Sequence, residues 1–288
     1  MSEDRNDMWL ISVLVVIPVI YLATGQTITP EMAEVLNRFV PNDAALTDRS
    51  LALWFIAGIA LAGSPLHLIG RYLPTVVHEL GHAFTAGILG GRPQQITISL
   101  NTSGLAAFSP PESWGRFRAS IVSIAGYLSP PIAGLAAVVG IQSGYPQSWF
   151  LFSAIVLALA IVFLVRNLWG FIWTAAVVVG CYFAVRYLPG EILSYSVAAI
   201  AGYLSIEGFR DVRTQQKIIK NSPGAGCDAE KIAYWWGLRP NSMARLHTLL
   251  VIFVAAYTVR MAVNPYWSEI YEWGTSIVET RKIERLIP

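Results

Sequence analysis

The chain has 288 residues, of which 55% are hydrophobic and 13% charged, and its formal net charge is +2. Soluble domains carry about 25% charged residues, so this composition excludes an ordinary soluble protein and indicates an integral, multi-pass protein of the lipid bilayer. The net charge is small, and the sequence has no basic stripe or recognisable nucleic-acid module, so no nucleic-acid partner is expected.

The first 50 residues are expected to hold one transmembrane helix and a polar loop. Residues 1–7 carry three acids and one Arg, which is the wrong charge for the start of a cleavable signal peptide. The apolar run at 8–24 therefore predicts a first spanning helix. Residues 25–50 are more polar and form either an ordinary loop or a short amphipathic helix at the surface.

Seven further apolar runs predict a membrane core at residues 51–265, followed by a C-terminal tail at 266–288. The run at 51–64 is short for a bilayer. It is either a separate span, a re-entrant segment, or the first part of the next helix, kinked at Pro65 and Pro74. The predicted fold class is therefore an all-α polytopic membrane protein with about 7–8 transmembrane helices. The other spans are expected at about 66–90, 117–141, 149–165, 168–188, 191–209 and 246–264.

The sequence His78-Glu79-Leu80-Gly81-His82 lies inside one of these apolar runs. Histidines four residues apart lie on one helical face, where both can bind a single Zn²⁺. Glu79 between them is placed to act as general base on a zinc-activated water. Ionisable groups at membrane depth are costly and tend to be functional, so the motif predicts a zinc-hydrolase site. The alternative is a polar cluster that only ties helices together by hydrogen bonds.

A small membrane-associated β-hairpin is predicted directly after this helix. Gln95–Leu100 alternates polar and apolar residues, Asn101–Gly104 has the composition of a turn, and Leu105–Phe108 is typical of a return strand. A two-stranded hairpin has exposed edges, and an extended substrate can pair with such an edge by strand addition. A simple connecting hairpin has the same pattern.

A catalytic zinc site usually has three protein ligands and an open position for water, so a third ligand must come from elsewhere in the chain. The candidate carboxylates are Glu191, Glu207, Asp211 and Asp228. Three of these residues also have a structural explanation in place of metal binding. In it, Asp228 caps a short helix, Asp211 is a surface charge, and Glu207 makes a polar contact within the bundle. Composition and spacing do not choose among them.

Three polar residues beside the apolar runs have less specific patterns. Asn167 lies between two runs, where its amide either orients a substrate backbone or a metal ligand, or belongs to a tight turn. His247 begins the last run next to basic residues, which predicts an interfacial position. His67 precedes His78 by about three helical turns, too far to bind the same metal.

The stretch at 210–245 is predicted to be a cytoplasmic loop. It holds seven basic residues and three acids, and the positive-inside rule places such a loop in the cytoplasm.

Taken in order along the chain, several short elements over about residues 65–245 resemble the site-2-protease-like intramembrane zinc metallopeptidases, specifically their compact bacterial branch without a PDZ domain. The most specific element is the His-Glu-x-x-His motif in an apolar helix. The others that carry the resemblance are Gly90-Gly91 before the hairpin, Ala125-Gly126-Tyr127-Leu128-Ser129-Pro130, Arg166-Asn167-Leu168-Trp169-Gly170 and Cys227-Asp228-Ala229.

The resemblance implies an intramembrane zinc metalloprotease of the bacterial plasma (inner) membrane that hydrolyses peptide bonds of membrane-anchored substrates. It also implies that His78 and His82 are zinc ligands, that Glu79 is the base, and that the hairpin presents the substrate as a strand.

The chain departs from this family in one respect. Better-known members supply the third ligand from a leucine-aspartate-glycine motif, which this sequence lacks. The resemblance makes Asp228 the first substitute, with Asp211 as the alternative. The departure also motivates a second hypothesis, in which the chain keeps the peptidase fold but is a catalytically inactive accessory subunit of a larger membrane complex, for example a respiratory assembly.

Overall fold

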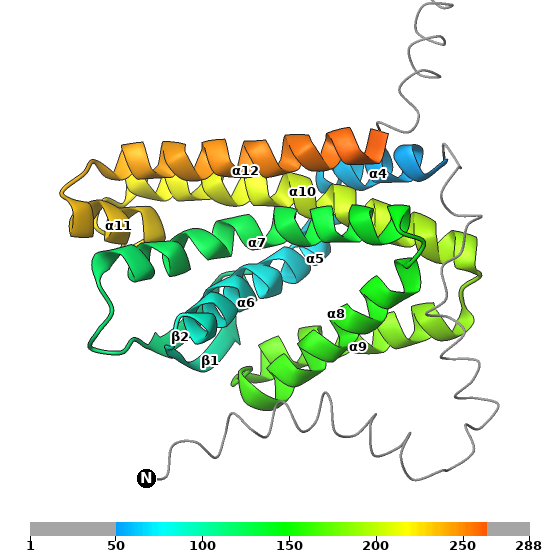
Figure 1. Cartoon of the computed structure of the whole chain (residues 1–288), viewed down its shortest axis with the longest axis horizontal. Coiled ribbons are helices and arrows are strands. Elements are labelled where there is room, and N and C mark those ends of the chain that lie inside the picture. The colour runs from blue at the N-terminus through cyan, green and yellow to red at the C-terminus, as the bar shows by residue number, and fades with distance from the viewer. Residues whose placement is uncertain (1–49, 264–288) are drawn as a thin grey trace, which may run out of the picture. The chain divides into compact units, whose positions relative to one another are not determined.

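The structure is a computed structural model that describes residues 50–263, a series of helices interrupted by one β-hairpin (Figure 1). The span predicted at 8–24 and the tail predicted at 266–288 lie outside the described residues. The elements in chain order are α4 (Ser50–Ala62), α5 (His67–Gly70), α6 (Tyr72–Ile88), β1 (Arg92–Ile98), β2 (Gly104–Ser109), α7 (Arg116–Gln142), α8 (Pro146–Phe163), α9 (Leu168–Tyr187), α10 (Gly190–Asn221), α11 (Asp228–Trp236) and α12 (Pro240–Val263).

Five of these helices, α7, α8, α9, α10 and α12, are long and apolar enough to cross a membrane. Their outer faces carry exposed apolar side chains such as Phe152, Phe183 and Phe253, which lipid solvates but water does not. The chain is therefore an integral membrane protein, largely helical as predicted. The total of 7–8 spans stays a prediction, because it includes the run at 8–24.

The predicted spans at 51–64 and 66–90 form one bent pair. Helix α4 and the α5–α6 segment meet at an angle of 92°, across a break of at most four residues, and together they qualify as a sixth span or a re-entrant segment. Pro65 lies in the break, where it has no helical hydrogen bond to remove. Pro74 lies in the first turn of α6, where its missing N–H is not needed, so the bend lies at the break that holds Pro65 and not at Pro74.

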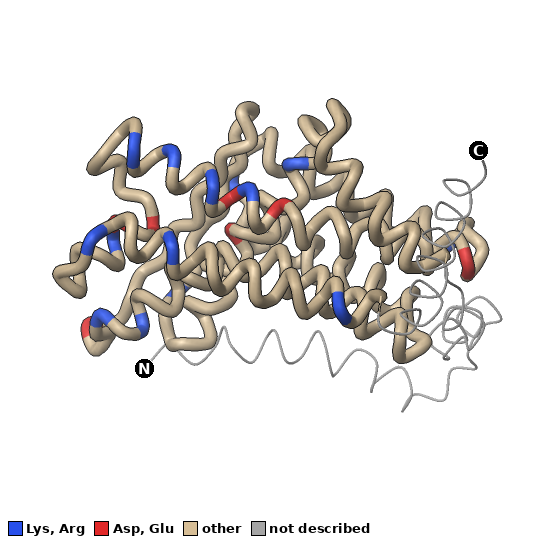
Figure 2. The backbone as a smooth tube through the Cα atoms, turned by 90° about the horizontal axis from the view of Figure 1, so that it is seen from above, with Lys and Arg blue, Asp and Glu red and all other residues tan. Residues whose placement is uncertain are grey.

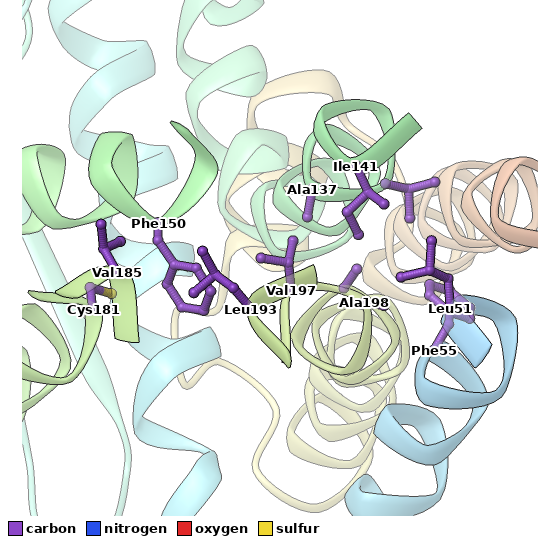
Figure 3. Packing of buried hydrophobic residues seen from close by; sticks show 12 residues of the cluster. Leu51, Phe55, Ala137, Ile141, Phe150, Cys181, Val185, Leu193, Val197 and Ala198 are labelled. Carbon is purple, nitrogen blue, oxygen red and sulfur yellow. The ribbon is translucent and has the colours of Figure 1, made fainter. Parts of the chain in front are cut away.

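Helix α10 lies in the middle of the bundle and packs against α4, α7 and α12, while α6 packs against α7. One apolar core joins five of the helices, as Figure 3 shows. Phe55 comes from α4, Ile141 from α7, Phe150 from α8, Val185 from α9 and Val197 from α10. Helix α6 has a second core with the hairpin, α8 and α9, which fixes the motif helix against the hairpin.

Strands β1 and β2 form the predicted antiparallel hairpin, with Ile96 opposite Ala106 and Ile98 opposite Gly104. The outer edge of β1 is covered by residues 164–167. The Ile96 N–H donates to the Leu164 carbonyl at 2.7 Å, and the Arg166 N–H donates to the Ile96 carbonyl at 3.1 Å. Backbone groups of alternate residues point to opposite edges of an antiparallel pair, so those of Gly104 and Ala106 point toward the other edge.

The segment predicted as a loop at 210–245 is mostly helical. Helix α10 continues to Asn221, α11 follows at Asp228, and α12 begins at Pro240. The correction has a simple cause, since these turns are polar and the apolar periodicity marks only the part of a helix inside the bilayer. Figure 2 shows that Lys and Arg gather toward the end of the bundle that carries α11.

Candidate metal centre

Helix α6 brings His78 and His82 together on one face, as the motif predicts. Their Nε2 atoms lie 3.1 Å apart. Asp228, the first residue of α11, places Oδ2 3.4 Å from Nε2 of His82. One ligand atom from each of the three residues lies within 4.8 Å of the others.

Two of these three separations, the one between the histidines and the one between His82 and Asp228, fit a zinc ion. Zinc bonds of about 2.0–2.1 Å in tetrahedral geometry place neighbouring ligand atoms about 3.3 Å apart, close to the two distances above. Imidazole nitrogens with one carboxylate oxygen are also a donor set that zinc accepts. The residues present therefore suit Zn²⁺ with one position left for water or substrate.

The two aspartates that sequence reasoning left open lie on different sides of the histidines. Asp228 faces Nε2 of His82, the side where the ligand atoms converge. Asp211 faces Nδ1 of His78, with Oδ2 at 3.8 Å. His82 has its Nδ1 2.7 Å from the Val122 carbonyl, so Nδ1–H donates and Nε2 keeps its lone pair for a metal.

Local structure holds Asp228 in place as an anion. Cys227 caps α11, and the Glu230 side chain accepts hydrogen bonds from the backbone N–H groups of Gly224, Gly226 and Cys227. Burial alone would raise the pKa of Asp228, but contact with His82 and the charge of Lys231 hold this pKa well below its usual range. The sequence alternative, in which Asp228 is the N-cap, is wrong by one residue because Cys227 is the cap.

Glu79 is buried between the histidines and the hairpin. Its side chain is 6% exposed and lies directly on β2, since a Cβ built at Gly104 would come within 2.6 Å of Glu79 Cγ. The Ala106 backbone amide donates a hydrogen bond to the Glu79 carboxylate. The candidate base therefore lies between the two histidines and the outer edge of β2.

Gly126 of α7 is a site residue that sequence analysis noted only as a small residue in a kinked span. A Cβ at this position would lie 2.7 Å from Nε2 of His78 and overlap Nε2 of His82. Only glycine lets α7 approach the Nε2 atoms of both histidines this closely.

We expect Gly126→Ala to weaken zinc binding, because the added methyl group pushes both imidazoles apart. Overpacking costs about 1–3 kcal/mol, which corresponds to a loss of about tenfold to a hundredfold in affinity. Competition with a chelating dye measures this. Gly140→Ala on the same helix is the control, since the nearest atom to its Cβ is 3.7 Å away, and it should bind zinc like wild type. Equal affinities for the two variants would contradict the close approach.

Two other carboxylates considered as ligands lie elsewhere. Glu207 is buried beside His67, at 3.5 Å, and Arg210, at 3.4 Å. Glu191 lies in the first turn of α10, about 30 Å along the helix from Asp211 at 1.5 Å per residue.

Asn167 supports the hairpin. Its Oδ1 accepts from the Ile98 N–H at 3.1 Å, and its Nδ2 donates to the Ile98 carbonyl at 2.7 Å. The amide thus occupies the outer edge of β1 as a neighbouring strand would. A direct contact of Asn167 with a substrate backbone remains a prediction, and in this structure both ends of the amide are bonded to β1.

His247, for which the sequence predicted an interfacial position, is buried within the helix bundle and 1% exposed. It contacts Gln215 Oε1 at 3.0 Å and stacks on Tyr127, with ring centroids 5.0 Å apart. Tyr127 in turn meets the His78 ring edge-on, at 4.7 Å. The partner that buries His247 lies far away in the sequence, so no local pattern revealed it.

A family model described as Peptidase M50B-like matches residues 51–263, well over half of the chain. The chain belongs to this family. The site-2-protease-like resemblance is thereby confirmed, and the family is one of membrane metallopeptidases that are in general zinc-dependent. No curated protein and no solved structure matches the chain.

Proposed function

We propose that this member of the M50B-like family is an active intramembrane zinc endopeptidase that cleaves membrane-anchored proteins. The observation that carries the proposal is the convergence of His78, His82 and Asp228 at zinc-ligand spacing beside the buried carboxylate of Glu79. A cluster that only ties helices together would not need ligand atoms pointing at one common position.

The three ligands would hold the zinc, and Glu79 would move the protons. When bound, zinc supplies Lewis-acid chemistry that acidifies water and polarises a peptide carbonyl. Glu79 accepts the proton of the attacking water and delivers it to the leaving amine. Helices α6 and α7 together with the hairpin limit access of bulk water to this carboxylate, which is buried.

The substrate would bind as an added strand on β2. Residues 164–167 already occupy the outer edge of β1, so within residues 50–263 a substrate strand would add at the outer edge of β2. There it would replace Glu79 as the acceptor of the Ala106 N–H. An extended segment placed there lies next to Glu79, which contacts Gly104 and Ala106. Strand addition also keeps the substrate unwound, which exposes the amide that a helix would screen.

The same proposal places the chain in the bacterial plasma membrane with residues 210–245 on the cytoplasmic side. The seven basic residues of this stretch and the gathering of Lys and Arg at the α11 end in Figure 2 support this orientation under the positive-inside rule.

The test is cleavage of single-span reporter proteins by the full chain in liposomes. We expect cuts inside the reporter's transmembrane segment, located by mass spectrometry, that stop with a zinc chelator and return with added zinc. If the zinc-loaded chain cuts no reporter and instead co-purifies at fixed stoichiometry with a membrane complex, the accessory-subunit function replaces the proposal.

A further inference from the structure

One face of α10 carries polar side chains at every fourth position from Tyr203 to Gln215. Residues four apart on a helix lie one above the other, so this face forms a ladder along the helix. Three of its members each meet the Nδ1 atom of a different histidine. The pairs are Glu207 with His67 at 3.5 Å, Asp211 with His78 at 3.8 Å, and Gln215 with His247 at 3.0 Å.

The middle pair concerns the metal centre directly. His78 has two ring nitrogens, and its Nε2 faces Nε2 of His82 at 3.1 Å. Its Nδ1 faces away from that position, toward Asp211 Oδ2. A carboxylate on this side cannot bind the same ion as Nε2, yet it can accept the Nδ1–H proton of the ring.

We propose that Asp211 is a positioning residue for His78, which it orients for metal binding by accepting a hydrogen bond from Nδ1–H. The inference rests on the proposed zinc site. Metal-binding histidines usually donate their second N–H to a carboxylate or a backbone carbonyl. His82 already has such a partner in Val122, at 2.7 Å, and Asp211 is the corresponding group for His78. The 3.8 Å separation closes to hydrogen-bond length with a shift of about 1 Å.

The ladder supports His78 from a second direction. Gln215 holds His247, which stacks on Tyr127, and the Tyr127 ring packs edge-on against His78. The imidazole of His78 is thus fixed by ring packing on one face, and Asp211 sets which nitrogen carries the proton. Glu207, one turn away, lies beside His67, whose Nδ1 accepts from the Arg210 guanidinium at 2.8 Å, and Glu207 does not reach the metal ligands.

The experiment compares metal binding by the full chain in detergent with that of Asp211→Asn, Asp228→Asn and Glu191→Gln. Zinc affinity comes from chelator competition, and the coordination sphere from the visible absorption of the Co²⁺-substituted protein. We expect Asp211→Asn to lose about 10- to 100-fold in zinc affinity while binding one metal at saturation with the Co²⁺ band intensity of wild type. Glu191→Gln, a carboxylate of the same helix far from the site, should match wild type.

Two results would overturn the inference. A zinc affinity of Asp211→Asn within twofold of wild type would show that His78 needs no carboxylate. A changed Co²⁺ band in Asp211→Asn together with an unchanged band in Asp228→Asn would make Asp211 the metal ligand instead. The outcomes are independent of turnover. If the chain binds zinc with the expected dependence on Asp211 but cleaves no reporter, the proposed function is wrong and the role of Asp211 stands. If wild type binds no zinc, both the proposed function and the role of Asp211 are wrong.

Discussion

Glu79→Gln is expected to abolish peptide cleavage while the variant still binds one zinc per chain. Glutamine has nearly the same shape as glutamate, so it fits the space beside Gly104, and its oxygen can still accept from the Ala106 amide. It cannot take a proton from water. Loss of a general base costs about 10²- to 10⁴-fold in rate, which brings turnover close to background.

Two measurements on the same preparation separate this result from misfolding. Metal analysis should find equal zinc in variant and wild type, and the rate of reporter cleavage in liposomes should fall only in the variant. Glu112→Gln is the control, since Glu112 lies in the connection between β2 and α7, exposed and outside the site. Cleavage by Glu79→Gln at the wild-type rate would remove Glu79 from the mechanism, and cleavage by neither protein would point to the accessory role.

The features that sequence analysis placed correctly are those encoded locally. The His-Glu-x-x-His spacing is set by a single helical turn, so His78 and His82 had to share a face once the helix was inferred. The hairpin followed from alternation within Gln95–Leu100 and a polar turn. The bend after α4 was one of the alternatives that Pro65 suggested.

Which of Asp211 and Asp228 lies on the Nε2 side of the histidines was not encoded locally. Asp211 and Asp228 are both acids in a polar stretch, and both lie far along the chain from His78 and His82. Sequence separation therefore does not favour one of them as a ligand. What separates them is tertiary, because α10 passes the Nδ1 side of His78 whereas α11 folds back and starts on the Nε2 side of His82. The burial of His247 was not foreseen for the same reason, since its partner Gln215 lies on another helix.

Asp228→Ala is expected to lose zinc almost completely, the largest effect on metal binding of any change outside the histidines. Total zinc-binding free energies of about 10–16 kcal/mol are shared among four ligands in structural sites. One ligand is therefore worth roughly 3 kcal/mol, or about a hundredfold or more in affinity. Metal analysis after extensive dialysis should find zinc in wild type and none in the variant.

Lys231→Ala is the matched control for this loss. Lys231 Nζ contacts the other oxygen of Asp228, Oδ1, at 3.1 Å, and its side chain is 50% exposed. An exposed ion pair contributes less than about 1 kcal/mol, so the control should lose no more than about fivefold in affinity. Zinc retained by Asp228→Ala would rule out Asp228 as the ligand. Equal losses in both variants would mean that the charge near α11, and not coordination by Oδ2, governs binding. Loss of zinc in Asp228→Ala with near-normal binding in Lys231→Ala would distinguish a ligand from a neighbouring charge. This result would show that the chain takes its third ligand from the start of α11, where better-known relatives use a leucine-aspartate-glycine motif.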